Sequence, residues 1–221
     1  MRFALSIFPI LLLTVFLLVY AEIAKKKKYV YILKPISTLL VIVALLLSFC
    51  EPTQKTSYSF LILMGLLFSF GGDIALMFQQ KRRYFALGLV LFLLAHIVYT
   101  IVFSLFDRFS TYDIISGIIL LAAAFAIYTL IKSNLGTLRI SVMVYIIVIS
   151  VMVNRAISTF DSSILDFLQA VMIASGALLF YISDIILAAD RYWKSWKYNR
   201  ISLAFYYIGQ FLIALSASYF K

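Results

Sequence analysis

Long apolar stretches separated by short polar breaks run along the whole chain. Most hold about 20 residues, the length at which a helix rising about 1.5 Å per residue crosses a hydrocarbon core about 30 Å thick. Pro35 lies near the start of the second stretch and Pro52 just after its end, positions that suit helix ends. We therefore predict eight transmembrane helices. They span residues 3–20, 30–49, 58–78, 84–106, 112–131, 138–153, 167–189 and 201–220.

The predicted fold is an all-α polytopic membrane bundle that forms a single integral-membrane domain over residues 1–221. The polar breaks are too short to contain a soluble domain. A transmembrane β-barrel is excluded because its strands are segments of about ten residues with alternating polarity. Composition agrees with a membrane bundle: 65% of the residues are hydrophobic and 13% are charged, whereas ordinary globular domains are nearer half apolar and a quarter charged.

Basic residues are concentrated in alternate loops, and this pattern predicts the orientation in the membrane. Loops rich in lysine and arginine face the cytoplasm. We therefore expect both termini to be extracytoplasmic, in a multi-pass protein of the cell membrane. Cleaving the first helix as a signal peptide would place the lysines at 25–28 on the wrong side, so we expect it to be retained. The basic loops contain Lys25, Lys26, Lys27, Lys28, Lys81, Arg82, Arg83, Lys132, Arg139, Arg191, Lys194, Lys197 and Arg200, against Arg2, Lys55, Arg108, Arg155 and Lys221 on the other side.

The net charge of +10 is explained mostly by this topology. The basic clusters are short and lack the aromatic platform of proteins that bind single-stranded nucleic acid, so we expect contacts with anionic lipid headgroups and no nucleic-acid partner. The chain has one cysteine and one histidine. An intrachain disulfide and a three-histidine zinc site are therefore excluded, and we predict neither a metal nor another cofactor.

Two aspartates lie inside apolar stretches, where a carboxylate is costly and usually functional. Asp73 and Asp184 each lie eight residues after a glycine, Gly65 and Gly176, and directly before an isoleucine. This matched pair in the third and seventh helices indicates two-carboxylate chemistry in one intramembrane pocket. The alternative for Asp73 is a structural ion pair with Lys34 that only holds helices together.

Further polar side chains are predicted at the depth of the two aspartates. Counting about 1.5 Å per residue from the cytoplasmic boundary places both aspartates about 10 Å deep, Gln210 about 13 Å, and Tyr206 and Tyr207 about 8 Å. Lys34 lies close to this level, and His96 lies nearer the midplane. Together they predict a pocket that opens to the cytoplasmic leaflet and fits a lipid headgroup. Interfacial tyrosines and hydrogen bonds between helices are the structural alternatives.

The order and spacing of these residues resemble the YhhN family, membrane lysoplasmalogenases with eight helices. Lys34-Pro35 is similar to the family's lysine motif in helix two, and Gly72-Asp73 to its Gly-Asp motif in helix three. Asn154 and Ile157 depart from the family pattern, which has an aromatic residue and a leucine there. The resemblance also covers Leu76, Gly88, Phe92, Ala95, His96, Tyr99, Phe103, Tyr145, Met152, Arg155, Gly176, Ala177, Leu178, Leu179, Phe180, Ser183, Asp184, Tyr206, Tyr207, Gln210, Phe211, Leu212, Ile213 and Ser216.

The resemblance implies hydrolysis of the vinyl ether bond of a lysoplasmalogen, a lysophospholipid, to a fatty aldehyde and glycerophosphocholine or glycerophosphoethanolamine. Protonation of the outer alkene carbon leaves an oxocarbenium ion, which water attacks. As in glycoside hydrolysis, one carboxyl group donates the proton while a second stabilises the cation or activates water. Asp73 and Asp184 are the predicted catalytic pair, with the acid unassigned. The predicted substrate-binding residues are Lys34, His96, Tyr99, Tyr206, Tyr207, Gln210 and Arg155.

Two other functions use the same residues. In a transporter, the aspartates and Lys34 would form a proton or cation relay, and a parallel duplication of the third and seventh helices suits that class. Transport also predicts matching polar groups in the outer leaflet, yet only Asn154 and Arg155 are candidates there, which disfavours this function. A lipid-binding protein without turnover leaves the carboxylate pair unexplained. Ordinary lipase chemistry is disfavoured because no serine lies in a G-x-S-x-G motif.

Overall fold

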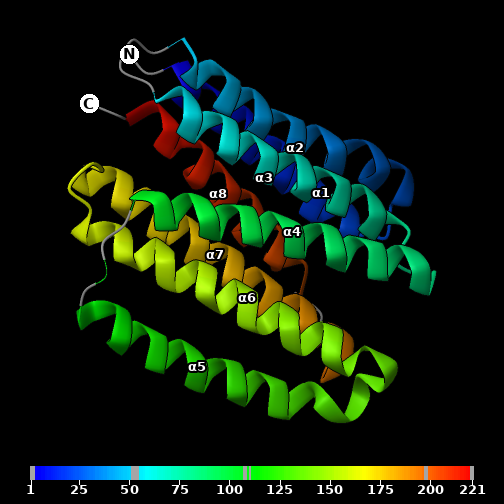
Figure 1. Cartoon of the computed structure of the whole chain (residues 1–221). Helices are drawn as coiled ribbons and strands as arrows, with labels where there is room; N and C mark the ends of the chain where they lie inside the picture. The colour runs from blue at the N-terminus through cyan, green and yellow to red at the C-terminus, as the bar shows by residue number, and fades with distance from the viewer. Residues whose placement is uncertain (1–2, 51–54, 107–108, 110, 197–198, 220–221) are drawn as a thin grey trace.

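The computed structural model describes residues 3–50, 55–106, 109, 111–196 and 199–219. Eight of its helices are long and apolar enough to cross a membrane, and no strand occurs among the described residues (Figure 1). The predicted all-α bundle of eight spans is therefore confirmed. The helices are α1 (Phe8–Ile23, after a 3₁₀ turn at Phe3–Ile7), α2 (Lys27–Ser48), α3 (Thr56–Met77), α4 (Arg82–Phe106), α5 (Thr111–Ile131), α6 (Arg139–Ser158), α7 (Phe167–Tyr192) and α8 (Ser202–Ser216).

The helix ends differ from the predicted ones by a few residues. Because α2 begins at Lys27, Pro35 lies inside the helix and not near its start as predicted. Lysines extend the helix at no cost where their ammonium groups reach the headgroup layer. α6 continues to Ser158 because its last polar side chains bond to α5. The predicted features at Arg2, Pro52, Arg108, Lys197, Phe220 and Lys221 lie outside the described residues.

α8 lies in the centre of the bundle and α5 at its edge. α8 contacts α1, α2, α3 and α7, and 67% of its apolar segment is buried. Only 17% of the corresponding segment of α5 is buried, since α5 packs mainly against α6 (Figure 1). Polar groups needed at the interior are therefore best supplied by α8 and its neighbours.

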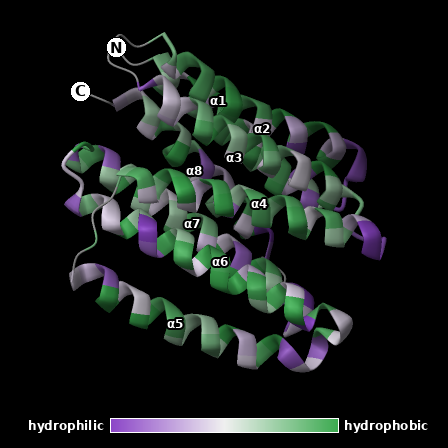
Figure 2. Ribbon diagram, in the orientation of Figure 1, coloured by the Kyte–Doolittle hydropathy of each residue, from purple (hydrophilic) through white to green (hydrophobic). Residues whose placement is uncertain are grey.

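Successive helices alternate in direction, so the loops after α1, α3, α5 and α7 lie at one end of the bundle (Figure 1). We call this end, which contains Lys25, Arg82, Arg191 and Arg200, the basic end. α1 begins and α8 ends at the opposite end. Apolar residues cover the helix bodies while hydrophilic residues gather near helix ends (Figure 2). Which end faces the cytoplasm stays a prediction.

Glycines allow two helix pairs to approach closely. In the α7–α8 pair, a Cβ at Gly176 would lie 2.7 Å from the carbonyl oxygen of Gly209, and a Cβ at Gly209 equally close to that of Gly176. In the α3–α4 pair, a Cβ at Gly65 would overlap the ring of Tyr99. Small residues at such crossings let helices associate by backbone contact in a membrane. Each pair includes one of the helices that contain an intramembrane aspartate.

Gly176→Ala is expected to lower the free energy of unfolding by about 1–3 kcal/mol, because the added methyl group meets a backbone oxygen that can move only with its helix. The measurement is thermal unfolding in detergent. The matched control is Gly117→Ala on α5, where the nearest atom to the new Cβ, Asn154 Nδ2, lies at 3.6 Å. We expect this control to be neutral or stabilising by up to about 1 kcal/mol. Equal unfolding temperatures for both variants would contradict the close α7–α8 contact.

Candidate active site

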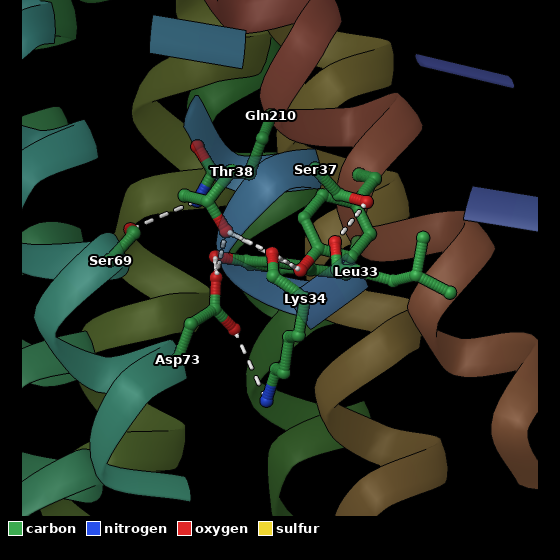
Figure 3. Close-up of polar contacts among 9 residues, drawn as sticks. Leu33, Lys34, Ser37, Thr38, Ser69, Asp73 and Gln210 are labelled. Carbon is green, nitrogen blue, oxygen red and sulfur yellow. Dashed lines mark hydrogen bonds and ion pairs between the residues drawn. The ribbon is translucent and has the colours of Figure 1, made fainter. Parts of the chain in front are cut away.

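The carboxyl group of Asp73 on α3 is surrounded by donors from α2 and α8. Lys34 Nζ lies 3.4 Å from its Oδ1, and the hydroxyl of Thr38 donates to Oδ2 at 2.7 Å (Figure 3). The hydroxyl of Tyr206 also donates to Oδ2, at 2.8 Å. Asp73 is only 2% exposed, so these partners replace the water that it loses. Three donors, one of them a cation, suit an ionised carboxylate.

The local sequence of α2 explains why two of these donors converge. Lys34 and Thr38 are four residues apart and therefore share one helix face. The hydroxyl of Tyr207 donates to the backbone carbonyl of Lys34 at 3.1 Å, which fixes α8 to this part of α2. Thr38 was not among the predicted site residues. The sequence feature that could have identified Thr38 is its position four residues after Lys34, on the helix face that contacts Asp73.

The carboxyl group of Asp184 on α7 has a different environment. The hydroxyl of Tyr145 on α6 donates a short hydrogen bond to Oδ2, and Nε2 of His96 lies 3.9 Å from the same oxygen. The His96 ring is fully buried between the rings of Phe180 and Tyr145, with centroids at 4.6 and 5.2 Å. Within the described ranges, no lysine or arginine forms an ion pair with Asp184. Asp184 therefore has a neutral phenol where Asp73 has a cation.

Both carboxyl groups line one polar cavity. The cavity has a volume of about 1010 Å³ and reaches the loops of the basic end. Asp73, Asp184, Lys34 and Tyr206 contribute to its wall. Four of the predicted site residues, from α2, α3, α7 and α8, are thus brought to one surface. The charged residues nearer its mouth are Glu22, Lys25, Lys27, Asp190, Arg191 and Arg200.

Four other predicted residues lie behind the cavity wall. The hydroxyl of Tyr99 donates to Oε1 of Gln210 at 2.8 Å. Nε2 of Gln210 donates to the hydroxyl of Ser69 at 2.9 Å (Figure 3). Tyr207 and His96 are also fully buried and do not line the cavity. The bonds of Gln210 connect α8 to α4 and to α3, the helix that holds Asp73.

Arg155 lies at the opposite end of the bundle, away from the cavity. Its Nη2 is 3.2 Å from Oδ1 of Asp113 on α5. Nδ2 of Asn154 donates to the carbonyl of Asp113 at 2.9 Å and to the hydroxyl of Ser116 at 2.8 Å, and Ser158 donates a short hydrogen bond to Asp113. These bonds attach α5 to α6. Sequence reasoning missed Asp113 because it lies at the edge of an apolar stretch.

The arrangement provides two carboxyl groups with different partners on one water-accessible wall. A carboxylate held by Lys34 can accept a proton or stabilise a cation, and a partly buried carboxyl group without a lysine or arginine beside it can hold a proton and donate it. In the part of the chain that the structure describes, no three acidic, histidine or cysteine side chains are grouped so that they could hold a metal ion. Tyr145 is a further residue that sequence reasoning did not assign to the site.

Comparisons with known proteins identify one matching family and several relatives of the chain. The YhhN family model matches residues 1–217. Lysoplasmalogenase TMEM86A of Homo sapiens is 32% identical over 159 residues, which cover 71% of this chain and 64% of the relative, and the protein of the same name from Bos taurus is 31% identical with the same coverage. A lysoplasmalogenase homolog of Dictyostelium discoideum is 26% identical over 207 residues, 76% of this chain and 66% of the relative. The chain therefore spans less than two thirds of the mammalian relatives. No solved structure matches it.

Proposed function

The chain belongs to the YhhN family, and from this premise we propose that it is a lysoplasmalogenase that hydrolyses the vinyl ether bond of an alkenyl lysophospholipid. The observation that carries the proposal is that Asp73 and Asp184 line one cavity together with Lys34. Vinyl ether hydrolysis needs a proton donor and a carboxylate on the same substrate, as glycoside hydrolysis does. Curated relatives named lysoplasmalogenase support the assignment.

The partners of the two aspartates support different roles. Asp73 accepts bonds from Thr38 and Tyr206 and pairs with Lys34; all of these stabilise a carboxylate, so we assign Asp73 as the general base. Asp184 accepts from the neutral phenol of Tyr145 and has no cation of comparable proximity among the described residues. We assign Asp184 as the general acid. Two carboxyl groups in different environments can thus supply an acid and a base without a metal.

The proposed reaction has three steps. The O–H bond of the Asp184 carboxyl group breaks, and the π electrons of the alkene form a bond between this proton and the outer alkene carbon. The carbon beside the ether oxygen becomes part of an oxocarbenium ion. Water adds to this carbon and gives its proton to Asp73. The hemiacetal then collapses to a fatty aldehyde, its hydroxyl proton is released, and the ether oxygen leaves as an alcohol with the proton from Asp73. A proton from water in the cavity restores Asp184, so the net reaction consumes one water molecule.

The remaining predicted residues receive supporting roles in this proposal. Basic groups near the mouth, Lys25, Lys27 and Arg200, suit the lipid phosphate, since ammonium and guanidinium groups bind phosphate oxygens. Lys34 holds Asp73, and Tyr206 connects Asp73 to the cavity wall. The buried Tyr99, Tyr207, Gln210 and His96 position the helices. We further propose that the basic end faces the cytoplasm, which would admit lipid from the inner leaflet.

The proposal is tested by supplying the purified protein in detergent with an alkenyl lysophospholipid and measuring fatty aldehyde. We expect aldehyde from the alkenyl lipid and no hydrolysis of the matched acyl-ester lipid, which has no alkene carbon to protonate. Absence of aldehyde from folded protein would overturn the proposal. If the protein instead collapsed an ion gradient in vesicles, the transporter function considered from the sequence would replace it.

A further inference from the structure

An apolar pocket lies beside the polar cavity in the half of the bundle near the basic end. It is bounded by side chains of α3, α4, α5, α6 and α7, among them Leu89, Ile127, Val142 and Ile146. The pocket is narrow, with a volume of about 70 Å³. Val142 and Ile146 are buried, 5% and 8% exposed, so this part of the pocket lies between the helices.

The pocket and the polar cavity share a stretch of wall that includes Asp184. The residues that line both are Leu76, Phe92, Asp184, Leu187 and Arg191. Tyr145, which donates to Asp184, lines the apolar pocket. Asp184 is the shared residue that has a carboxyl group, so a molecule that extends along this shared wall from the cavity into the pocket lies beside that group.

We infer that the apolar pocket binds the start of a single hydrocarbon chain whose polar headgroup occupies the cavity, so that the chain-to-glycerol junction lies at Asp184. This inference rests on the proposed function and identifies the part of the site that binds the chain. Each buried methylene group contributes about 0.8 kcal/mol, so even a short enclosed segment fixes the chain. A narrow pocket admits one chain and disfavours two-chain lipids.

The position of the junction gives a separate reason for the acid role of Asp184. In an alkenyl lysophospholipid the ether oxygen joins the glycerol to the first chain carbon, and the carbon that receives the proton is the second. With the chain in the pocket, the second carbon lies on the apolar side, where Asp184 is bound by Tyr145. The first carbon then faces the cavity, which contains Asp73 and admits water.

The location is tested with a saturated 1-O-alkyl lysophospholipid that carries a photoreactive diazirine on an early chain carbon. This lipid has no alkene, so its binding does not depend on turnover. We expect the label on pocket residues such as Val142, Ile146 or Ile127, and a decrease in labelling when excess unlabelled alkyl lipid competes. Labels confined to lipid-facing residues such as Val144, without competition, would overturn the inference.

A pair of matched variants tests the same pocket by kinetics. Val142→Phe fills the pocket, whereas Val144→Phe on the same helix adds the same group at a position that is 40% exposed. For a long alkenyl chain, we expect Val142→Phe to raise KM about tenfold, as losing roughly two buried methylene groups would, and to weaken photolabelling. Val144→Phe should match wild type. Identical behaviour of the two variants would overturn the inference.

The two proposals can fail separately. Pocket labelling without aldehyde formation would support the chain site and reject the proposed hydrolysis. Aldehyde formation with labelling outside the pocket would reject the chain site and leave the proposed hydrolysis intact.

Discussion

Asp184→Asn is expected to lower the rate of aldehyde release about 10²- to 10⁴-fold, the usual contribution of a general acid. An amide cannot give a proton to carbon, yet its oxygen can still accept the hydrogen bond from Tyr145. The fold should therefore persist, and the loss should appear in kcat. The measurement is the steady-state rate with an alkenyl lysophospholipid, together with the unfolding temperature of the variant.

The control for this variant is Asp161→Asn. Asp161 is an exposed carboxylate in the 3₁₀ turn that follows α6, at the end of the bundle opposite the basic end. Its replacement makes the same chemical change without reaching the cavity, so we expect the rate of wild type. A folded Asp184→Asn protein with an unchanged rate would remove Asp184 from the reaction.

Lys34→Met is expected to lower the free energy of unfolding by about 3–5 kcal/mol, the usual cost of leaving one member of a buried ion pair alone. Methionine retains much of the apolar side chain, but Asp73 loses its cation and stays 2% exposed. The measurement is thermal or denaturant unfolding in detergent. Thr38 and Tyr206 still donate to the carboxylate, so the loss should be smaller than for a carboxylate without any partner.

The double variant Lys34→Met/Asp73→Asn separates stability from catalysis. It contains no unpaired charge, so we expect most of the lost stability to return, as it often does when both members of a buried pair become neutral. Activity should not return, because asparagine cannot accept the proton from water. Recovery of both properties would show that Asp73 and Lys34 form only a structural ion pair, the alternative considered from the sequence.

The hydrophobic pattern predicted the eight helices because the thickness of a bilayer fixes how long an apolar stretch must be. It also predicted that polar residues from different helices share one level of the bundle. Residues on different helices at one depth can meet, and the structure brings Lys34, Asp73 and Tyr206 into direct contact. Asp184 reaches the same cavity. A buried carboxylate needs hydrogen-bond or charged partners. The sequence therefore predicted that Asp73 and Asp184 have such partners, even where it did not identify them.

Depth alone does not specify which neighbour a side chain faces. Gln210 lies close to the predicted level, but it is turned toward Tyr99 and Ser69 and away from the cavity. Tyr145 and Thr38 went unassigned because tyrosine and threonine occur widely in membrane helices, and only the rotation of α6 and α2 shows that they contact the aspartates. The ion pair between Arg155 and Asp113 was not predicted either, because it depends on how α5 packs against α6.

The backbone contact between Gly176 and Gly209 has a mechanical consequence for the site. Asp184 lies about two helical turns beyond Gly176, and Tyr206 lies one turn before Gly209. At this crossing each glycine faces the backbone carbonyl oxygen of the other, and a backbone oxygen can move only with its helix. This backbone contact therefore fixes how closely α7 and α8 approach, and with it the distance between Asp184 and Tyr206, about two turns and one turn away along their helices.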